Sequence, residues 1–247
     1  MNVFYRTFAV LSWLFMSIHI MAQPSDVPRT FKVTYKADYR GLPISAKGIR
    51  ELQQTASGQH LLKSSAKSLF ATIEESSTFL LKDGIAQPQA YRYQRTGLGK
   101  NKNINLDFDW SGRIVTDRLK KTQYPLKPGL ATSDKLLYQF QLQADLLKAS
   151  RLNKKPNNLN YTIMDESRIK EYQFEIVGEE LLTTKLGQIN TWKIRRSNSA
   201  TDRSTTLWMA PEYEFMLVRF EQTDQNNKGF SLMIEEAQMA GMLISEF

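Results

Sequence analysis

The sequence contains no cysteine and only two histidines among its 247 residues. Without cysteine the chain has no thiol nucleophile, no thiolate metal site and no disulfide to staple its fold. His19 lies in an apolar N-terminal segment, so His60 is the one histidine of the remaining chain. One histidine cannot build a histidine-rich zinc site, and at a predicted strand start we interpret His60 as an exposed side chain. We therefore expect no metal, no cofactor and no catalytic residue.

Long hydrophobic runs are also scarce, and the single one lies at the N-terminus. After Arg6, residues 7–20 are almost entirely apolar or small, and Ala22 supplies the small residue that a signal peptidase requires. The run is shorter than the ~20 residues that span a bilayer, which favours a cleaved secretory signal over an anchor. No cysteine follows, which excludes a lipid-anchored lipoprotein. We predict removal of residues 1–22 and a single β-rich domain over residues 23–247, in the periplasm and without an integral membrane segment.

Acidic residues are outnumbered: 25 Asp and Glu face 33 Lys and Arg, a net charge of +8. Such an excess favours anionic partners, and export removes nucleic acid from among them. The pairs Lys120-Lys121 and Lys154-Lys155, like Arg195-Arg196, stand near predicted loops or strand ends. They either solubilise the surface or contact phospholipid head groups and lipopolysaccharide phosphates. Lys120, Lys121, Lys154 and Lys155 are the candidate basic surface, and nothing in the sequence indicates the oligomeric state.

The most frequent pattern is the alternation of apolar and polar residues. Phe31, Val33 and Tyr35 alternate with lysine and threonine, which predicts a strand with one buried face. Three such runs form the block from Gly187 to Phe220, which we expect at the centre of the core with Trp208 buried. Turn signals and short connections join about a dozen strands, as in antiparallel sandwiches and barrels. The other predicted strands cover residues 31–39, 44–54, 59–67, 68–81, 89–96, 104–110, 113–119, 159–163, 172–176, 181–185 and 230–234.

The period changes once, after the two prolines of residues 124–129, which exclude regular structure there. Residues 134–150 carry leucines and Phe140 at helical spacing, with Ser133 or Asp134 available as a cap. This apolar stripe is wider than one sheet contact needs, so it either packs deep in the core or lines a cleft for a lipophilic ligand. Leu142 and Leu146 are the candidate cleft residues. The predicted fold is an antiparallel sheet, curved into a half-barrel or flattened barrel, with this helix packed on it.

Acidic residues offer the remaining route to catalysis. Asp107 and Asp109 share one face of a predicted strand, and a solvated strand edge explains them better than a glycosidase-like or metal-binding pair. The match to a calcium loop that begins at Asp107 fails, because its twelfth position is Arg118 instead of a bidentate glutamate. Adjacent glutamates such as Glu74 and Glu75 point to opposite faces of a strand.

A family resemblance rests mainly on the second half of the chain. The pattern Tyr172-x-Phe174-x-Ile176-x-Gly178-x-Glu180, followed by Leu207-Trp208-Met209-Ala210 and Val218-Arg219, resembles the bacterial envelope family labelled domain of unknown function 3108. Met216-Leu217-Val218 departs from the Leu-Pro-Val that is usual in that family. The resemblance covers most of residues 31–235 and implies an exported, mainly antiparallel β domain with no established activity. The remaining residues that fit its layout are Tyr35, Gly41, Asp109, Trp110, Asp134, Gly187, Thr191 and Arg195.

Three functions remain open from the sequence. The favoured one is non-enzymatic binding of a lipophilic or anionic component of the cell envelope. The second is a protein interaction module that adds a strand to a partner through an exposed sheet edge. The third is an enzyme that acts on envelope glycans through acidic residues.

Overall fold

The computed structural model describes residues 26–40, 45–97, 100–156, 159–197, 204–224 and 229–245. Strands account for most of them. The first half of the chain forms eight: β1 (Phe31–Arg40), β2 (Ser45–Gln54), β3 (His60–Lys67), β4 (Ala71–Lys82), β5 (Ile85–Gly97), β6 (Lys102–Asp109), β7 (Ile114–Asp117) and β8 (Thr122–Pro125).

The second half holds the α-helix α1 (Leu137–Arg151), the short 3-10 helix η1 (Pro211–Tyr213) and eight further strands. These strands are β9 (Thr132–Asp134), β10 (Leu159–Asp165), β11 (Arg168–Thr184), β12 (Gly187–Ser197), β13 (Ser204–Ala210), β14 (Met216–Thr223), β15 (Gly229–Met239) and β16 (Met242–Ile244).

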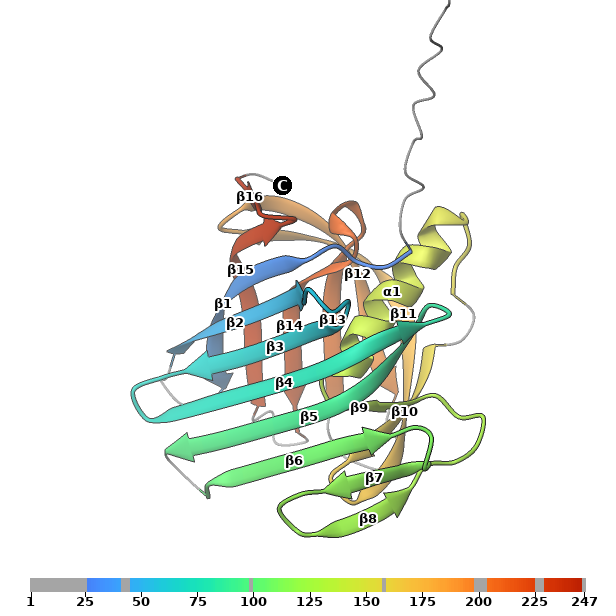
Figure 1. Cartoon of the computed structure of the whole chain (residues 1–247). Helices are drawn as coiled ribbons and strands as arrows, with labels where there is room; N and C mark the ends of the chain where they lie inside the picture. The colour runs from blue at the N-terminus through green and yellow to red at the C-terminus, as the bar shows by residue number, and fades with distance from the viewer. Residues whose placement is uncertain are drawn as a thin grey trace, which may run out of the picture.

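All described strands belong to one sheet with the order β8-β7-β6-β5-β4-β3-β2-β1-β15-β14-β13-β12-β11-β10-β9, and β16 pairs with β15. We call β1–β8 the N-terminal wall and β9–β15 the C-terminal wall; β1 and β15 pair and join them. The pairs are antiparallel except for β9 with β10. The sheet curves so that the walls face each other with α1 between them (Figure 1), which confirms the predicted half-barrel with one packed helix.

The helix is buried on two sides, and this explains its wide apolar stripe. Leu137 and Phe140 belong to a core cluster that includes Leu62, Phe79 and Leu106 of the N-terminal wall. A second cluster packs the other side of the helix against the C-terminal wall. Its members include Tyr138, Leu142, Leu146, Tyr161, Phe174, Ile194 and Leu207. A helix that contacts two sheet walls needs apolar side chains around most of its circumference.

The helix begins at Leu137, three residues later than predicted, because residues 132–134 form β9. Asp134 still holds the helix start: its Oδ1 accepts hydrogen bonds from the N–H groups of Leu136 and Leu137, at 2.9 and 2.8 Å. The prediction that prolines exclude regular structure over residues 124–129 is wrong for Tyr124 and Pro125, which end β8. This strand is the edge of the sheet, where the donor that proline lacks is not required.

Two predicted strands, residues 172–176 and 181–185, are parts of the single 17-residue strand β11. A bulge between Ile176 and Gly178 shifts its register with β12. Gly178 has φ 153°, a conformation that only glycine adopts readily, so the bulge occurs where the sequence permits it. The apolar C-terminal segment, which could not be placed from its pattern, contributes β16. The predicted signal at residues 1–22 and Gly41 lie outside the described residues.

Candidate functional site on the inner face of the sheet

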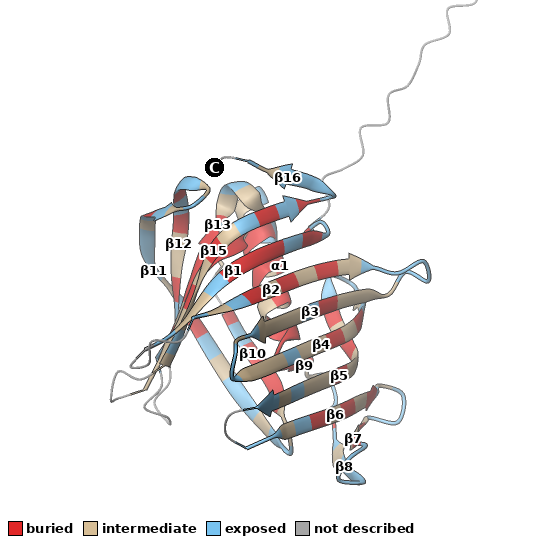
Figure 2. Cartoon of the chain, turned by 90° about the vertical axis from the view of Figure 1, so that its left-hand side faces the viewer, coloured by how far each residue is buried: buried red, intermediate tan, exposed pale blue. Residues whose placement is uncertain are grey.

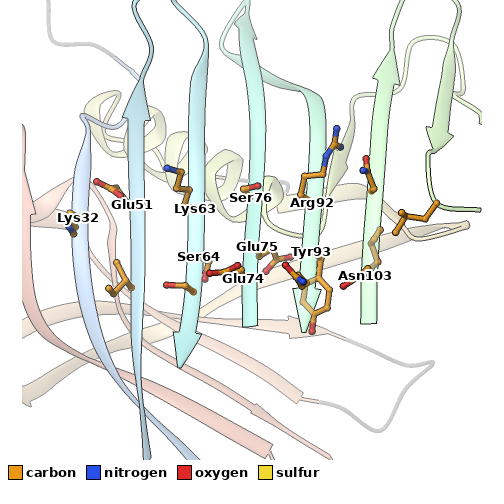
Figure 3. A pocket seen from close by; sticks show the side chains of 16 residues that line it. Lys32, Glu51, Lys63, Ser64, Glu74, Glu75, Ser76, Arg92, Tyr93 and Asn103 are labelled. Carbon is orange, nitrogen blue, oxygen red and sulfur yellow. The ribbon is translucent and has the colours of Figure 1, made fainter. Parts of the chain in front are cut away.

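The N-terminal wall has a hollow of about 670 Å³ over β1–β6 (Figure 3). The register places Lys32, Glu51, Lys63 and Arg92 in one row on the face turned away from α1. Arg92 is paired there with Asp107, at 2.6 Å. A row that mixes positive and negative side chains along an exposed strand face is typical of a protein surface in water. Because both signs are present, the row does not indicate whether a ligand would be anionic or cationic.

On the opposite, inner face of the sheet, charged side chains occupy positions whose inward-facing neighbours are apolar. Arg50 alternates with the buried Gly48 and Leu52 on β2 and is itself only 7% exposed. Its Nη1 donates a hydrogen bond to Oε1 of Gln139, in the first turn of α1. Burial lowers the pKa of Arg50, while the charges of Tyr35, Tyr138 and Glu75 act in the opposite direction. Arg50 thus links the N-terminal wall to the helix without a direct ion pair in the described part of the chain.

Arg196 occupies the corresponding place on the C-terminal wall. It follows the buried Ile194 on the inner face of β12 and is 8% exposed. Its guanidinium carbon lies 4.4 Å from the centroid of the Tyr172 ring. Its Nε is buried and has no hydrogen-bond partner, and no carboxylate of the described residues forms an ion pair with it. A buried cation that has no counter-charge among the described residues is costly, so Arg196 is an unusual feature of this interior.

Tyr138, in the first turn of α1, lies between the two arginines. Its ring meets Tyr172 edge-on at a centroid distance of 5.4 Å. Burial raises its pKa, and the positive charges of Arg196 and Arg50 both oppose that shift. Both guanidinium groups therefore act on this one side chain, from opposite walls of the sheet.

Two carboxyl groups, those of the partly buried Glu75 and the buried Asp134, lie in the same interior. Glu75 accepts a 2.5 Å hydrogen bond from the Tyr91 hydroxyl, and Asp134 accepts one of 2.5 Å from the Ser77 hydroxyl. Burial raises the pKa of Glu75. Burial also raises the pKa of Asp134 to about 7, although its hydrogen bonds from Ser77, Leu137 and Leu136 oppose the rise. Because burial favours the neutral form of both acids, they only partly balance the positive charge of the arginines.

Solvent reaches part of this inner face. Ser64 and Tyr93 lie in the same cross-strand row as Arg50 and Glu75, and Ala66 and Ile73 lie in the next inner row. All four of these side chains are partly exposed although they face inward. Figure 2 shows the two walls diverging from each other at the end away from α1. The charged cluster therefore borders a surface that a dissolved molecule can reach.

The candidate residues named from the sequence lie in separate parts of the structure. Leu142 and Leu146 have no exposed surface, so they would meet a ligand only after α1 moved. Lys120 pairs with Asp117 and Glu166, at 3.6 and 3.7 Å, and exposed Lys121 follows it. Lys154 and Lys155 are exposed beyond the end of α1, far from the β7–β8 turn (Figure 1). The four lysines therefore do not form one surface.

The other candidates have structural partners. Arg92 and Arg118 both bind Asp107, and although burial alone would raise its pKa, these bonds hold it below the ordinary value. Asp109 accepts hydrogen bonds from Gly112 and Ser111, which lower its pKa and close a turn. His60 is half-buried rather than exposed: it stacks on Phe79 at 5.2 Å, and burial lowers its pKa.

Sequence reasoning missed Arg50. It named Arg196 and Glu75 only as members of adjacent pairs and did not place either of them on the inner face. A signal existed for the arginines, because each occupies an apolar position of its strand's alternation, next to Leu52 or Ile194. In the part of the chain that the structure describes, no group of three or more His, Cys, Asp or Glu residues is placed to hold a metal ion. Within the same residues, no helix is long and apolar enough to cross a membrane.

The fold and the site define a half-barrel β protein with a helix between its walls and two buried arginines, Arg50 and Arg196, on its inner face. The family described as "Protein of unknown function (DUF3108)" matches residues 30–235, and the chain belongs to this family. That finding confirms the resemblance seen in the sequence. No curated protein matches the chain.

Solved structures resemble the fold at low sequence identity. A β-barrel-like protein of domain of unknown function DUF1849 from Brucella abortus is 8% identical with a TM-score of 0.57, over 86% of this chain and 98% of that one. The MucA/MucB complex of Pseudomonas aeruginosa gives 8% and 0.34, over 88% of this chain and 54% of that one. A putative outer membrane lipoprotein-sorting protein domain from Vibrio parahaemolyticus gives 7% and 0.24, over 86% of each. The first likeness concerns the fold alone.

Proposed function

We propose that this protein is a non-enzymatic binding protein of the bacterial periplasm that holds an anionic component of the cell envelope on its inner face. One observation carries the proposal: Arg196 is 8% exposed and its buried Nε has no hydrogen-bond partner. Removing a charged group from water without compensation costs several kcal/mol. A carboxylate or phosphate on the inner face would offset that cost, because arginine binds both in a bidentate geometry.

Arg50, on the opposite wall, also favours a negatively charged ligand. The first turn of α1 lies between the two arginines, and Gln139 holds Arg50 from that turn. Two guanidinium groups that face one interior from separate walls attract an anion and repel a cation. The apolar packing around them lowers the local dielectric constant and strengthens both effects.

The two other functions have less support. Strand addition requires an accessible edge, but the two strands that end the sheet, β8 and β9, have only four and three residues, and β8 ends in Pro125. The longer open edge is residues 175–184 of β11, which extend beyond β10 and, among the described strands, pair with β12 alone. A glycan-acting enzyme requires available acidic groups, but Asp107 is held by two arginines and Asp109 closes a turn. The periplasmic location rests on the predicted N-terminal signal.

The test compares adjacent arginines on opposite faces of β12. Protein purified from the periplasm is titrated by calorimetry with hexyl phosphate, and with hexanol as the uncharged reference. Wild type is expected to bind the phosphate and not the alcohol. Arg196→Gln should weaken binding about 30-fold or more, since removing one partner of a buried charge pair costs roughly 2 kcal/mol or more.

Arg195→Gln is the matched control, because Arg195 is exposed and pairs with Glu175 at 2.8 Å on the outer face. It removes the same charge from the neighbouring position and should leave binding nearly unchanged. Equal binding by wild type and Arg196→Gln, or absence of phosphate binding by folded wild type, would contradict the proposal. Arg50→Gln should weaken binding in the same direction as Arg196→Gln.

A further inference from the structure

Arg196, which pairs with Phe174 of β11 on one side, continues on its other side into a cross-strand row of the inner face. The register places it opposite Thr205, Thr205 opposite Gln222, Gln222 opposite Phe230, and Phe230 opposite Tyr39. Residues directly opposite in paired strands project from the same face. The row therefore changes from a buried cation, through two hydrogen-bonding side chains, to two aromatic rings.

The aromatic end of this row is exposed to solvent. Tyr39 is 46% exposed and Phe230 is 37% exposed, although both point to the inner face of the sheet. Phe220, in the next inner row, is buried and stacks on Phe230 at a centroid distance of 5.2 Å. Leu232, directly opposite Phe220, is partly buried and packs against the same cluster. These four residues, which we call the aromatic end, form an apolar cluster whose Tyr39 and Phe230 side chains contact water in the free protein.

The facing part of the N-terminal wall carries small inner side chains. Gly48 is paired with Ala66 across β2 and β3, and Ala46 is the next inward-facing residue of β2. Ala46, Ser64 and Ala66 are partly exposed. Small side chains on this wall leave the aromatic end uncovered from the opposite side. An apolar chain is the kind of group that would be stabilised by contact with that end.

From these observations we infer that the ligand is a single-chain amphiphile: its anionic head is bound at Arg196, and its alkyl chain lies across the aromatic end. The inference rests on the proposed function and adds the second half of the ligand. Arg196 and Phe230 are separated by three strand spacings, about 14 Å in all, which is within reach of one molecule. Thr205 and Gln222, which are hydrogen-bonded to each other at 3.2 Å, stand beside the head.

The experiment is a chain-length series with one constant head group. Hexyl, octyl and decyl phosphate are titrated calorimetrically into the purified protein, each below the concentration at which it forms micelles. In wild type the affinity should rise with length, by about fourfold for each methylene group that becomes buried. In Phe230→Ser the dependence on length should be much weaker, while hexyl phosphate still binds because Arg196 is intact.

Leu80→Ser is the control, because Leu80 is 39% exposed but lies on the outer face of β4. It should retain the wild-type dependence on length. If the three phosphates bind wild type equally, or if Phe230→Ser leaves the dependence intact, the amphiphile inference is wrong while anion binding stands. If none of the phosphates binds, the proposed function itself fails. Unchanged circular dichroism of both variants would show that the differences do not arise from unfolding.

Discussion

Substitution of Trp208 by alanine tests whether the contacts of this side chain stabilise the C-terminal wall. Its ring is 3% exposed, between Arg219 at 4.6 Å and Lys193 at 5.2 Å from the ring centroid. Its indole Nε1 donates a 3.0 Å hydrogen bond to Oε2 of Glu180, beyond the β11 bulge. Replacing a buried tryptophan by alanine costs about 3–5 kcal/mol. Each cation–π contact that is lost adds about 0.5–1 kcal/mol, because the side chains of Lys193 and Arg219 are 38% and 29% exposed.

The measurement for Trp208→Ala is urea unfolding followed by far-ultraviolet circular dichroism, which does not depend on the tryptophan that is removed. Trp208→Phe keeps an aromatic ring but loses the hydrogen bond to Glu180, so it should cost about 1–2 kcal/mol. Trp110→Ala is the comparison for a partly buried ring and should cost less than Trp208→Ala. An unchanged unfolding midpoint for Trp208→Ala, or an equal loss at both tryptophans, would refute the reasoning.

Three more results are expected. Burial raises the pKa of Asp134 from 3.8 to about 7, so its contribution to stability is present below about pH 4 and is lost as the pH rises through 7. The unfolding free energy should fall by up to about 4 kcal/mol over this range. Unfolding curves of Asp134→Asn should lack this pH dependence. Leu142→Ala should cost about 2–5 kcal/mol in urea unfolding, because the side chain has no exposed surface; a loss below 1 kcal/mol would show that it is not in a packed core. N-terminal sequencing of the periplasmic protein should begin near Gln23, and full-length chain in the membrane fraction would contradict the predicted signal.

Alternation in the sequence predicted most of the strands because each wall has one buried face. In β1, for example, the apolar residues Phe31, Val33 and Tyr35 are the ones that face the core. It could not predict which strands pair. The β1–β15 pairing joins residues about 200 positions apart, such as Tyr35 and Ile234, and no local signal encodes it. The same limit applies to the helix. Its wide apolar stripe left core packing and a ligand cleft open, and only the curved sheet, which contacts the helix on two sides, accounts for the width of the stripe.

The candidate site was largely missed for a related reason. Surface lysines stand out in a sequence because they come in pairs, but Lys120-Lys121 and Lys154-Lys155 lie on separate elements. Arg196 forms such a pair with Arg195 in the sequence. Its inward orientation follows only from the phase of β12, which Ile194 sets and which places the neighbours Arg195 and Arg196 on opposite faces.

The seam between β1 and β15 also determines when the protein can finish folding. The strands from β1 to β8 pair in chain order and can form hairpin by hairpin, whereas β1 obtains its second partner only when β15 is available. Contacts between such distant segments close slowly. A chain that emerges from its N-terminus must therefore keep the free edge of β1 unpaired until β15 has appeared, and an unpaired edge is a site of aggregation. A chaperone that covers β1 during this interval would prevent aggregation of the whole molecule by binding one strand.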